Sequence, residues 1–263
     1  RRLLAHTPTR VVAVAGMEAE LGATTAAMNL GAALVLQGKD VLLLDEHGMA
    51  VDSTCALWSL DPLGTLADVA LRRLTCEGAA ARARCGASVL PALPGVREQS
   101  ADPRRLWQGD VILIDAVFDG EGRLSELAQM ADELVLVLQP HATSITSAYS
   151  GIKRLHYAHA LRQLRLLING VADPEAAQQV KANLRHTASR YLAVSLQPAG
   201  WVRADPHLRD ARRLSRTVVE AFPASPAAVD FRRIAADMGQ WPRRPGGTLP
   251  VPPPGGTGRA GGT

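Results

Sequence analysis

The sequence contains little cysteine, and this excludes one class of fold. Only three cysteines occur among 263 residues, and their spacings match no zinc-binding or redox motif. A framework of disulfide bonds is therefore not expected. We expect Cys55, Cys76 and Cys85 to act as small apolar residues of the core.

Long apolar runs are also missing. No run approaches the ~18 residues that a membrane-spanning helix needs. The opening stretch, RRLLAHTPTR, lacks the apolar segment of a secretory signal. The sequence therefore predicts a soluble, cytoplasmic protein.

A strong excess of one charge is absent as well. Lys and Arg number 29 against 25 Asp and Glu, which gives a net charge of +4 at pH 7. So mild an excess does not predict direct binding of nucleic acid. One group of arginines late in the chain has largely helical spacing, and we interpret it as a solvated helix face. The group consists of Arg203, Arg209, Arg212, Arg213 and Arg216.

Apolar residues, in contrast, make up 47% of the chain, enough to bury the core of one α/β domain. Five short apolar runs alternate with segments whose apolar residues recur every three to four positions, as in helices. Such runs are typical of parallel strands covered on both faces. We therefore predict an α/β fold with a doubly wound, mostly parallel sheet and helices on both faces. The runs are residues 11–15, 41–45, 111–115, 134–138 and 164–169.

Two of these runs end in an aspartate, Asp45 and Asp115. Ligands of doubly wound sheets bind at the carboxyl ends of the strands, so each carboxylate would lie where a phosphate or metal binds. Either aspartate could instead cap the turn that follows its strand. Their occurrence after two separate strands favours a nucleotide site.

The segment after the first run carries the main functional signal. Residues 16–25 read GMEAELGATT and precede a helical pattern. A glycine-containing loop between a buried strand and a helix offers free backbone amides and a positive helix end to an anion. This is the geometry of a phosphate-binding P-loop, although an ordinary glycine turn would read similarly.

The loop resembles the Walker A segment of the MinD/ParA ATPases, which reads SGKGGVGKTT in that family. Gly22, Thr24 and Thr25 match the family pattern. Ala23 occupies the position of the phosphate-binding lysine, and Glu18 that of the family's signature lysine. The resemblance therefore implies a P-loop fold with ATP and magnesium as cofactors, but with both loop cations replaced and ATP binding weak or absent.

Further positions match the family's nucleotide site. The resemblance implies that Asn169 reads the adenine base and that magnesium, if nucleotide binds, is held by Thr24, Asp45 and Asp115. His47 stands where the family has the aspartate that orients the attacking water, so no catalytic residue is assigned. The implied nucleotide-binding residues are Gly16, Gly22, Ala23, Thr24, Thr25 and Asn169.

A later segment narrows the resemblance. Residues 140–153, PHATSITSAYSGIK, are similar to the PEPTSITDAYALIK segment of the flagellar-number regulators of the FlhG/FleN type. We expect Thr143 or Ser144 to cap a helix there, with Ile145, Tyr149 and Ile152 on its buried face. His156 and His159, further along this helix, are expected to face solvent.

The resemblance implies a regulator of flagellar number or placement that acts through protein partners, with an impaired ATPase site. The implied partners are an FlhF-like GTPase or a flagellar transcription activator, with a possible homodimer. Two alternatives remain open: an active or slow ATPase switch, and a MinD-like accessory of polysaccharide synthesis or DNA partition. Membrane docking is unsupported, because residues 226–238 have the apolar spacing of a packed helix.

Three regions follow from this interpretation. Residues 1–10 resemble the end of an amino-terminal activation segment, and residues 11–241 would form the MinD-like domain. Residues 242–263 are rich in proline and glycine with almost nothing to bury, so a disordered tail is expected.

Overall fold

Eight strands form one sheet in the computed structural model, which describes residues 8–48, 50–94, 102–192 and 194–242. The strands are β1 (Arg10–Gly16), β2 (Val41–Asp45), β3 (Ala81–Arg82), β4 (Ser88–Pro91), β5 (Val111–Asp115), β6 (Glu133–Leu138), β7 (Gln163–Val171) and β8 (Ser195–Arg203). The helices are α1 (Ala23–Leu36), α2 (Thr54–Leu57), α3 (Leu66–Ala70), α4 (Cys76–Ala79), the 3₁₀ helix η2 (Pro103–Arg105), α5 (Glu126–Gln129), α6 (Ala142–His159), α7 (Pro174–Leu192), α8 (His207–Arg213), α9 (Val218–Ala221) and α10 (Pro226–Met238).

The strand order is β3-β4-β2-β5-β1-β6-β7-β8, and every pairing is parallel except that of β3 with β4. The predicted fold class is confirmed. The five apolar runs are β1, β2, β5, β6 and β7, whereas β3, β4 and β8 were not predicted. Because β1 lies at the centre of the order, the loop that follows it opens at the middle of the sheet's carboxyl edge.

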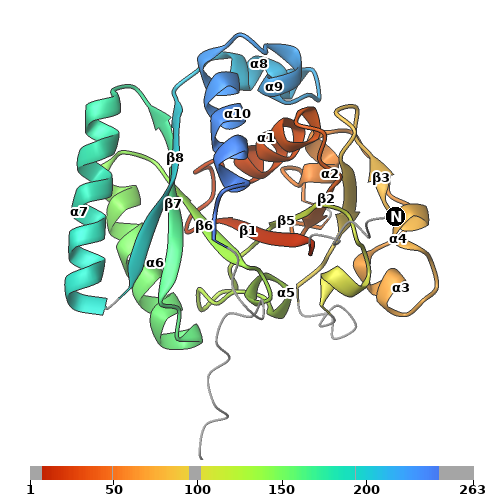
Figure 1. Ribbon diagram of the computed structural model, residues 1–263, viewed down its shortest axis with the longest axis horizontal. Coiled ribbons are helices and arrows are strands. Elements are labelled where there is room, and N and C mark those ends of the chain that lie inside the picture. The colour runs from red at the N-terminus through yellow and green to blue at the C-terminus, as the bar shows by residue number, and fades with distance from the viewer. Residues whose placement is uncertain (1–7, 49, 95–101, 193, 243–263) are drawn as a thin grey trace, which may run out of the picture.

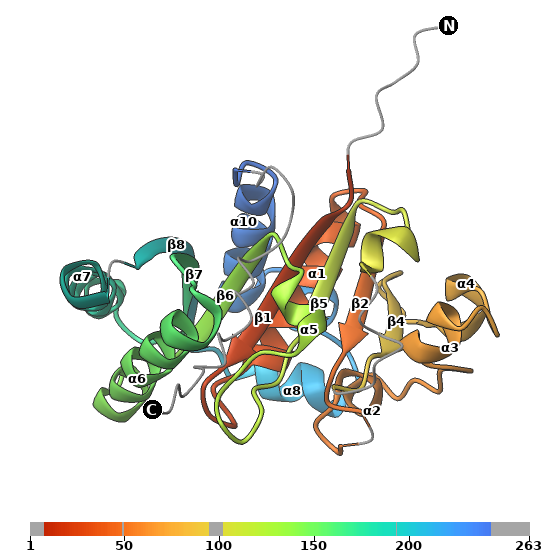
Figure 2. The same ribbon diagram turned by 90° about the horizontal axis from the view of Figure 1, so that it is seen from below.

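Alternation of side chains along the strands divides the core into two layers. In β1, Val11 and Ala13 pack into one layer, and Val12 and Val14 into the other. Helices α3 to α7 cover the first layer, and α1, α2 and α8 to α10 cover the second. Figure 1 shows α6 and α7 beside β7 and β8 at one end of the sheet, with α3 and α4 at the other. In Figure 1, α10 lies above the central strands and α5 below them, and Figure 2 shows the same elements from below.

The start of α6 differs in detail from the prediction. The cap is His141, whose Nδ1 accepts a hydrogen bond from the Ser144 amide at 3.2 Å. Ser144 is fully buried, and its hydroxyl accepts instead from the Gln139 amide at 2.9 Å. The expected cap by Thr143 or Ser144 is therefore wrong, because the helix begins before either residue. Of the expected buried face, Ile152 lies in the core, whereas Ile145 and Tyr149 are half-buried and pack against it.

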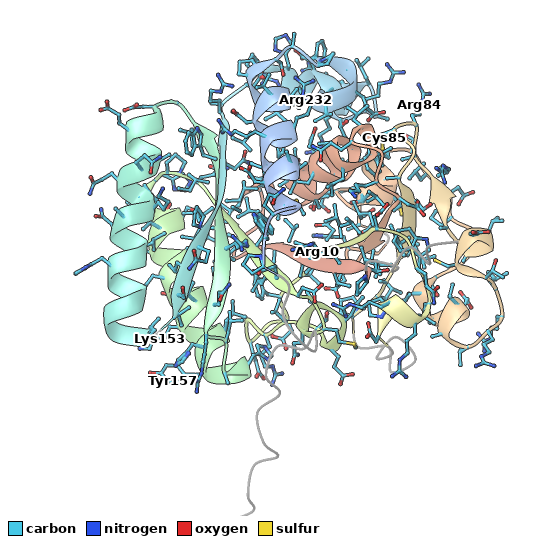
Figure 3. The ribbon with its side chains drawn as sticks, viewed as in Figure 1. Arg10, Arg84, Cys85, Lys153, Tyr157 and Arg232 are labelled. Carbon is cyan, nitrogen blue, oxygen red and sulfur yellow. The ribbon has the colours of Figure 1, made fainter. Side chains whose placement is uncertain are left out.

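The far end of α6 corrects a second expectation. His159 is only 6% exposed, and its Nε2 accepts a hydrogen bond from the Leu124 amide at 3.1 Å. Burial lowers the pKa of His159. This histidine was expected to face solvent, but the loop before α5 packs against it. On the same helix, Lys153 and Tyr157 lie at the periphery (Figure 3), and Tyr157 is 70% exposed.

The opposite edge of the sheet, where the strands begin, is closed by the residues after α10. Arg10, labelled in Figure 3, is the first residue of β1, and its Nη2 donates to the Trp241 carbonyl at 2.8 Å. The Arg165 guanidinium lies 4.2 Å from the centre of the Trp241 ring and 3.3 Å from the Glu133 carboxylate. These contacts join β1, β6 and β7 to the end of the described chain.

The three cysteines form no disulfide, and burial raises the pKa of Cys55 to about 12 and of Cys76 and Cys85 to about 11. No helix in the described part of the chain is long and apolar enough to cross a bilayer. Strand β1 begins at Arg10, inside the region interpreted as an activation remnant. Residues 1–7 of that region and residues 243–263 of the expected tail lie outside the described residues.

Candidate functional site

A cleft of about 940 Å³ opens at the carboxyl ends of the central strands. Its floor is the loop from Gly16 to Gly22, which joins β1 to α1, together with the first turn of α1. One wall comes from the loop after β2, and another from residues 116–122 after β5. The structure thus places the predicted loop at the edge of the sheet where doubly wound folds bind ligands.

Gly22 fixes the shape of this loop. Its φ of 88° is left-handed, and its carbonyl accepts the first backbone bond of α1 from Ala26 at 2.8 Å. A Cβ at this position would lie 2.3 Å from the Asn169 side-chain nitrogen. That nitrogen donates to the Leu21 carbonyl at 2.9 Å. The end of β7 therefore holds the loop against the helix.

Replacing Gly22 by alanine tests this arrangement. We expect a loss of about 1–3 kcal/mol from the left-handed φ, and about 1 kcal/mol more because Asn169 must leave Leu21. Gly38→Ala is the matched control, since Gly38 has a φ of 77° and no atom within 4 Å of the place that a Cβ would take. Urea unfolding of both variants measures the difference. Equal losses would show that Asn169 does not constrain the loop.

Glu20 also adopts a left-handed φ, of 64°, at a position where the resembling loops have glycine. A non-glycine residue pays about 1 kcal/mol or more for this conformation. Gln139, just after β6, donates to the Glu20 carbonyl at 3.2 Å and holds the loop in place. The backbone of a phosphate cradle is thus retained without its usual glycine.

The charges around the cleft do not match a polyphosphate. The loop itself carries no cation, because Ala23 and Glu18 stand at the two lysine positions. Carboxylates outnumber guanidinium groups among the described residues that line the cleft. The carboxylates belong to Glu18, Glu20, Asp52 and Asp119, and the guanidinium groups to Arg154 and Arg212.

Asp115, at the end of β5, is completely buried, and its carboxylate contacts three polar side chains. Its Oδ1 accepts a hydrogen bond from the Thr24 hydroxyl at 3.2 Å, and its Oδ2 accepts from the Thr54 hydroxyl at 3.2 Å. The His47 Nε2 lies 3.5 Å from the same Oδ1 and 3.3 Å from the Thr24 hydroxyl. The hydrogen bond with Asp115 raises the pKa of His47.

Asp45, at the end of β2, uses its carboxylate within its own loop. Its Oδ1 accepts from the His47 amide and its Oδ2 from the Cys55 amide, both at 3.0 Å. Burial raises the pKa of Asp45, and the negative charge of Asp115 adds to this effect. The structure therefore brings Thr24 and Asp115 together, whereas both Asp45 oxygens are engaged by backbone amides.

Glu46 was not predicted to take part in the site. It is 3% exposed, accepts a hydrogen bond from the Ser125 hydroxyl, and accepts another from the Val117 amide at 3.1 Å. Its own amide donates to the Asp115 carbonyl at 3.1 Å. Burial outweighs these hydrogen bonds and raises the pKa of Glu46 to about 7. This side chain clamps the loop after β5 to the end of β2.

Comparison with known proteins decides the family. No model of a known protein family matches the chain. The antiactivator FleN of Pseudomonas aeruginosa is 30% identical over 247 residues, which cover 89% of this chain and 88% of FleN. The chain belongs to the MinD/ParA family, in the branch of FlhG and FleN. An uncharacterized ATP-binding protein of Methanocaldococcus jannaschii is 28% identical over 242 residues, 86% of either chain.

Solved structures of the MinD/ParA family share the fold of this MinD-like chain. The MinD cell division protein of Aquifex aeolicus superposes with a TM-score of 0.69 at 21% identity, covering 90% of this chain and 99% of that one. MinD of Pyrococcus horikoshii, solved with Mg-ADP, has a TM-score of 0.65 at 24% identity, covering 88% and 96%. The predicted P-loop fold is confirmed, and at these identities the likeness concerns the fold alone.

The residues of this MinD/ParA-family site fit one half of magnesium-bound ATP better than the other. The Asn169 Oδ1 has no hydrogen-bond partner among the described residues and could accept from an adenine amino group, but it is buried and Asn169 is not among the described residues that line the cleft. The other half fits poorly, because the loop lacks a cation and both Asp45 oxygens are taken. In the described ranges no three His, Cys, Asp or Glu side chains converge as a metal site. The described residues at the magnesium and triphosphate positions therefore fit those groups less well than the fold alone would suggest.

Proposed function

We propose that this chain is a regulator of flagellar number or placement that acts by binding protein partners, with impaired binding and hydrolysis of ATP. Two observations support the pathway: the similarity to the antiactivator FleN along 89% of the chain, and the segment at residues 140–153. A related fold acts with a partner too, since MinD of Aquifex aeolicus has been solved in complex with MinC.

We infer the impaired ATPase from the charges in the cleft. Among the described residues that line it there is no lysine, and Glu18 adds a negative charge. A charge-assisted hydrogen bond contributes roughly 1.5–3 kcal/mol, so each missing lysine weakens binding by about one to two orders of magnitude. The carboxylates at the rim oppose a triphosphate further. The backbone of the loop alone does not compensate for these losses.

The partners we propose are an FlhF-like GTPase or a flagellar transcription activator. We also propose a homodimer, which a measurement of the molecular mass in solution would test. Direct binding of nucleic acid is not part of the proposal, because the net charge of the chain is only +4. Membrane docking is not part of it either, because α10 packs into the core through Phe231 and Ile234. A cytoplasmic location is proposed, which agrees with three free cysteines.

Isothermal titration with ATP and magnesium tests the proposed loss of nucleotide chemistry. We expect no saturable binding at micromolar concentrations and no release of phosphate. Tight binding with measurable turnover would refute this part of the proposal. Capture of flagellar proteins by the purified chain tests the pathway separately, and failure to capture either proposed partner would count against it.

A slow ATPase switch is the second candidate. The free Asn169 Oδ1 and the hydrogen bond between Thr24 and Asp115 favour it, since both are parts of a nucleotide site. Single-turnover hydrolysis with excess enzyme distinguishes the candidates. A slow release of phosphate that is lost in Thr24→Val would support the switch.

A further inference from the structure

His47 lies against the two groups that would face a metal ion, Thr24 and Asp115, which also hydrogen-bond each other directly at 3.2 Å. Its Nε2 lies 3.3 Å from the Thr24 hydroxyl and 3.5 Å from Asp115 Oδ1. The imidazole is 23% exposed and lines the cleft, whereas Asp115 behind it is fully buried. The ring therefore separates the buried carboxylate from the cleft.

Three chain segments meet at this ring. Thr24 comes from the first turn of α1, Asp115 from the end of β5, and His47 from the loop after β2. The His47 amide is itself anchored on Asp45 Oδ1 at 3.0 Å, which fixes where the side chain starts. The position of the His47 side chain is thus set by the hydrogen bond of its own amide and by the contacts of its ring with Thr24 and Asp115.

We propose that His47 takes the place of the divalent cation, so that its Nε2 bridges Thr24 and Asp115 and the cleft works without magnesium. In this respect the inference deepens the proposed function and rests on it. An N–H donor satisfies the buried carboxylate as a cation would. A metal ion entering from the cleft would have to displace the ring before reaching the buried Asp115.

The geometry has a testable consequence, because removing the ring should uncover a latent cation site. The variant is His47→Asp, which supplies a carboxylate and frees the space that the ring fills beside Thr24 and Asp115. The full chain is titrated with Mn²⁺ without nucleotide, and bound Mn²⁺ is counted by electron paramagnetic resonance alongside thermal unfolding. We expect no stoichiometric Mn²⁺ binding by the wild type. For His47→Asp we expect one bound ion and a metal-dependent rise in Tm of about 2–4 °C.

His141→Asp is the matched control, because it makes the same change at an exposed helix cap away from Asp115. We expect it to bind no Mn²⁺. His47→Ala provides a second variant in case the new carboxylate disturbs folding; its Tm should fall without metal and recover partly with Mn²⁺. Circular dichroism verifies that each variant is folded.

Two results would overturn the inference: one Mn²⁺ bound tightly by the wild type, or folded His47→Asp and His47→Ala variants that bind none. Neither depends on nucleotide. If the wild type instead bound ATP tightly in the absence of metal, the proposed impairment of ATP binding would fail while the role of His47 would stand. The two failures are therefore distinguishable.

Discussion

Restoring lysine at position 23 is expected to raise the affinity of this chain for ADP and ATP by roughly 10- to 100-fold. Ala23 is the first residue of α1 and lines the cleft. A lysine there would direct its ammonium group to the phosphates that the loop amides surround. Adding Glu18→Lys removes a repulsive carboxylate and supplies a second cation, so the double variant should gain roughly 10²- to 10⁴-fold.

A fluorescent-nucleotide titration of wild type, Ala23→Lys and the double variant measures this gain. Leu36→Lys is the matched control. Leu36 is 61% exposed at the other end of the same helix, about 20 Å away by helical rise, so the net charge changes equally. We expect this control to leave affinity unchanged. If Ala23→Lys gained no more than Leu36→Lys, the interpretation of residues 16–25 as a phosphate cradle would be wrong.

The second large effect concerns Glu46 and depends on pH. The folded protein raises the pKa of this carboxyl from 4.5 to about 7. Between these values the folded state keeps a proton that the unfolded state releases, so stability falls as pH rises through the window and then levels off. The shift corresponds to on the order of 3 kcal/mol at pH 8.

Glu46→Gln should remove this dependence. The amide imitates the protonated acid, since its oxygen can accept from the Val117 amide while its nitrogen donates to the Ser125 hydroxyl. We expect the variant to match the wild type near pH 5 and to be more stable by up to about 3 kcal/mol at pH 8. Urea unfolding at both pH values is the measurement. Glu20→Gln, at an exposed loop position, controls for the loss of charge.

If the difference in unfolding free energy between the wild type and Glu46→Gln were the same at both pH values, burial would not be keeping Glu46 protonated. Glu46→Ala is expected to behave differently from both, because it leaves Ser125 and Val117 without their acceptor. It should be less stable than Glu46→Gln at either pH, by about 1–3 kcal/mol. The comparison separates the cost of a buried charge from the benefit of the clamp.

The contacts around Glu46 and His47 bear on how the protein works. Glu46 ties the loop after β5 to the end of β2, and His47 links that end to α1. A switch needs two arrangements that a ligand can select, so a ligand that moved these loops apart would have to break both sets of contacts.

The central strands could be predicted because their signal is local. Each is a nearly continuous apolar run, as expected for strands covered on both faces. The strands towards the two ends of the sheet have no such signal. Strand β4 has four residues and ends in proline, and in β8 only every third residue is buried. Their place in the sheet depends on neighbours that lie far away in the sequence.

By itself the sequence determined the fold class, the position of the phosphate loop and the absence of its lysines, because these depend on residue types in one short stretch. Only the tertiary structure decided how the acidic residues are used. Ser125 meets Glu46 across 79 positions, Thr24 meets Asp115 across 91, and His47 reaches Thr24 across 23. Periodicity reports which face of an element is buried, whereas contacts between polar side chains arise only where the sheet brings separate loops to one edge.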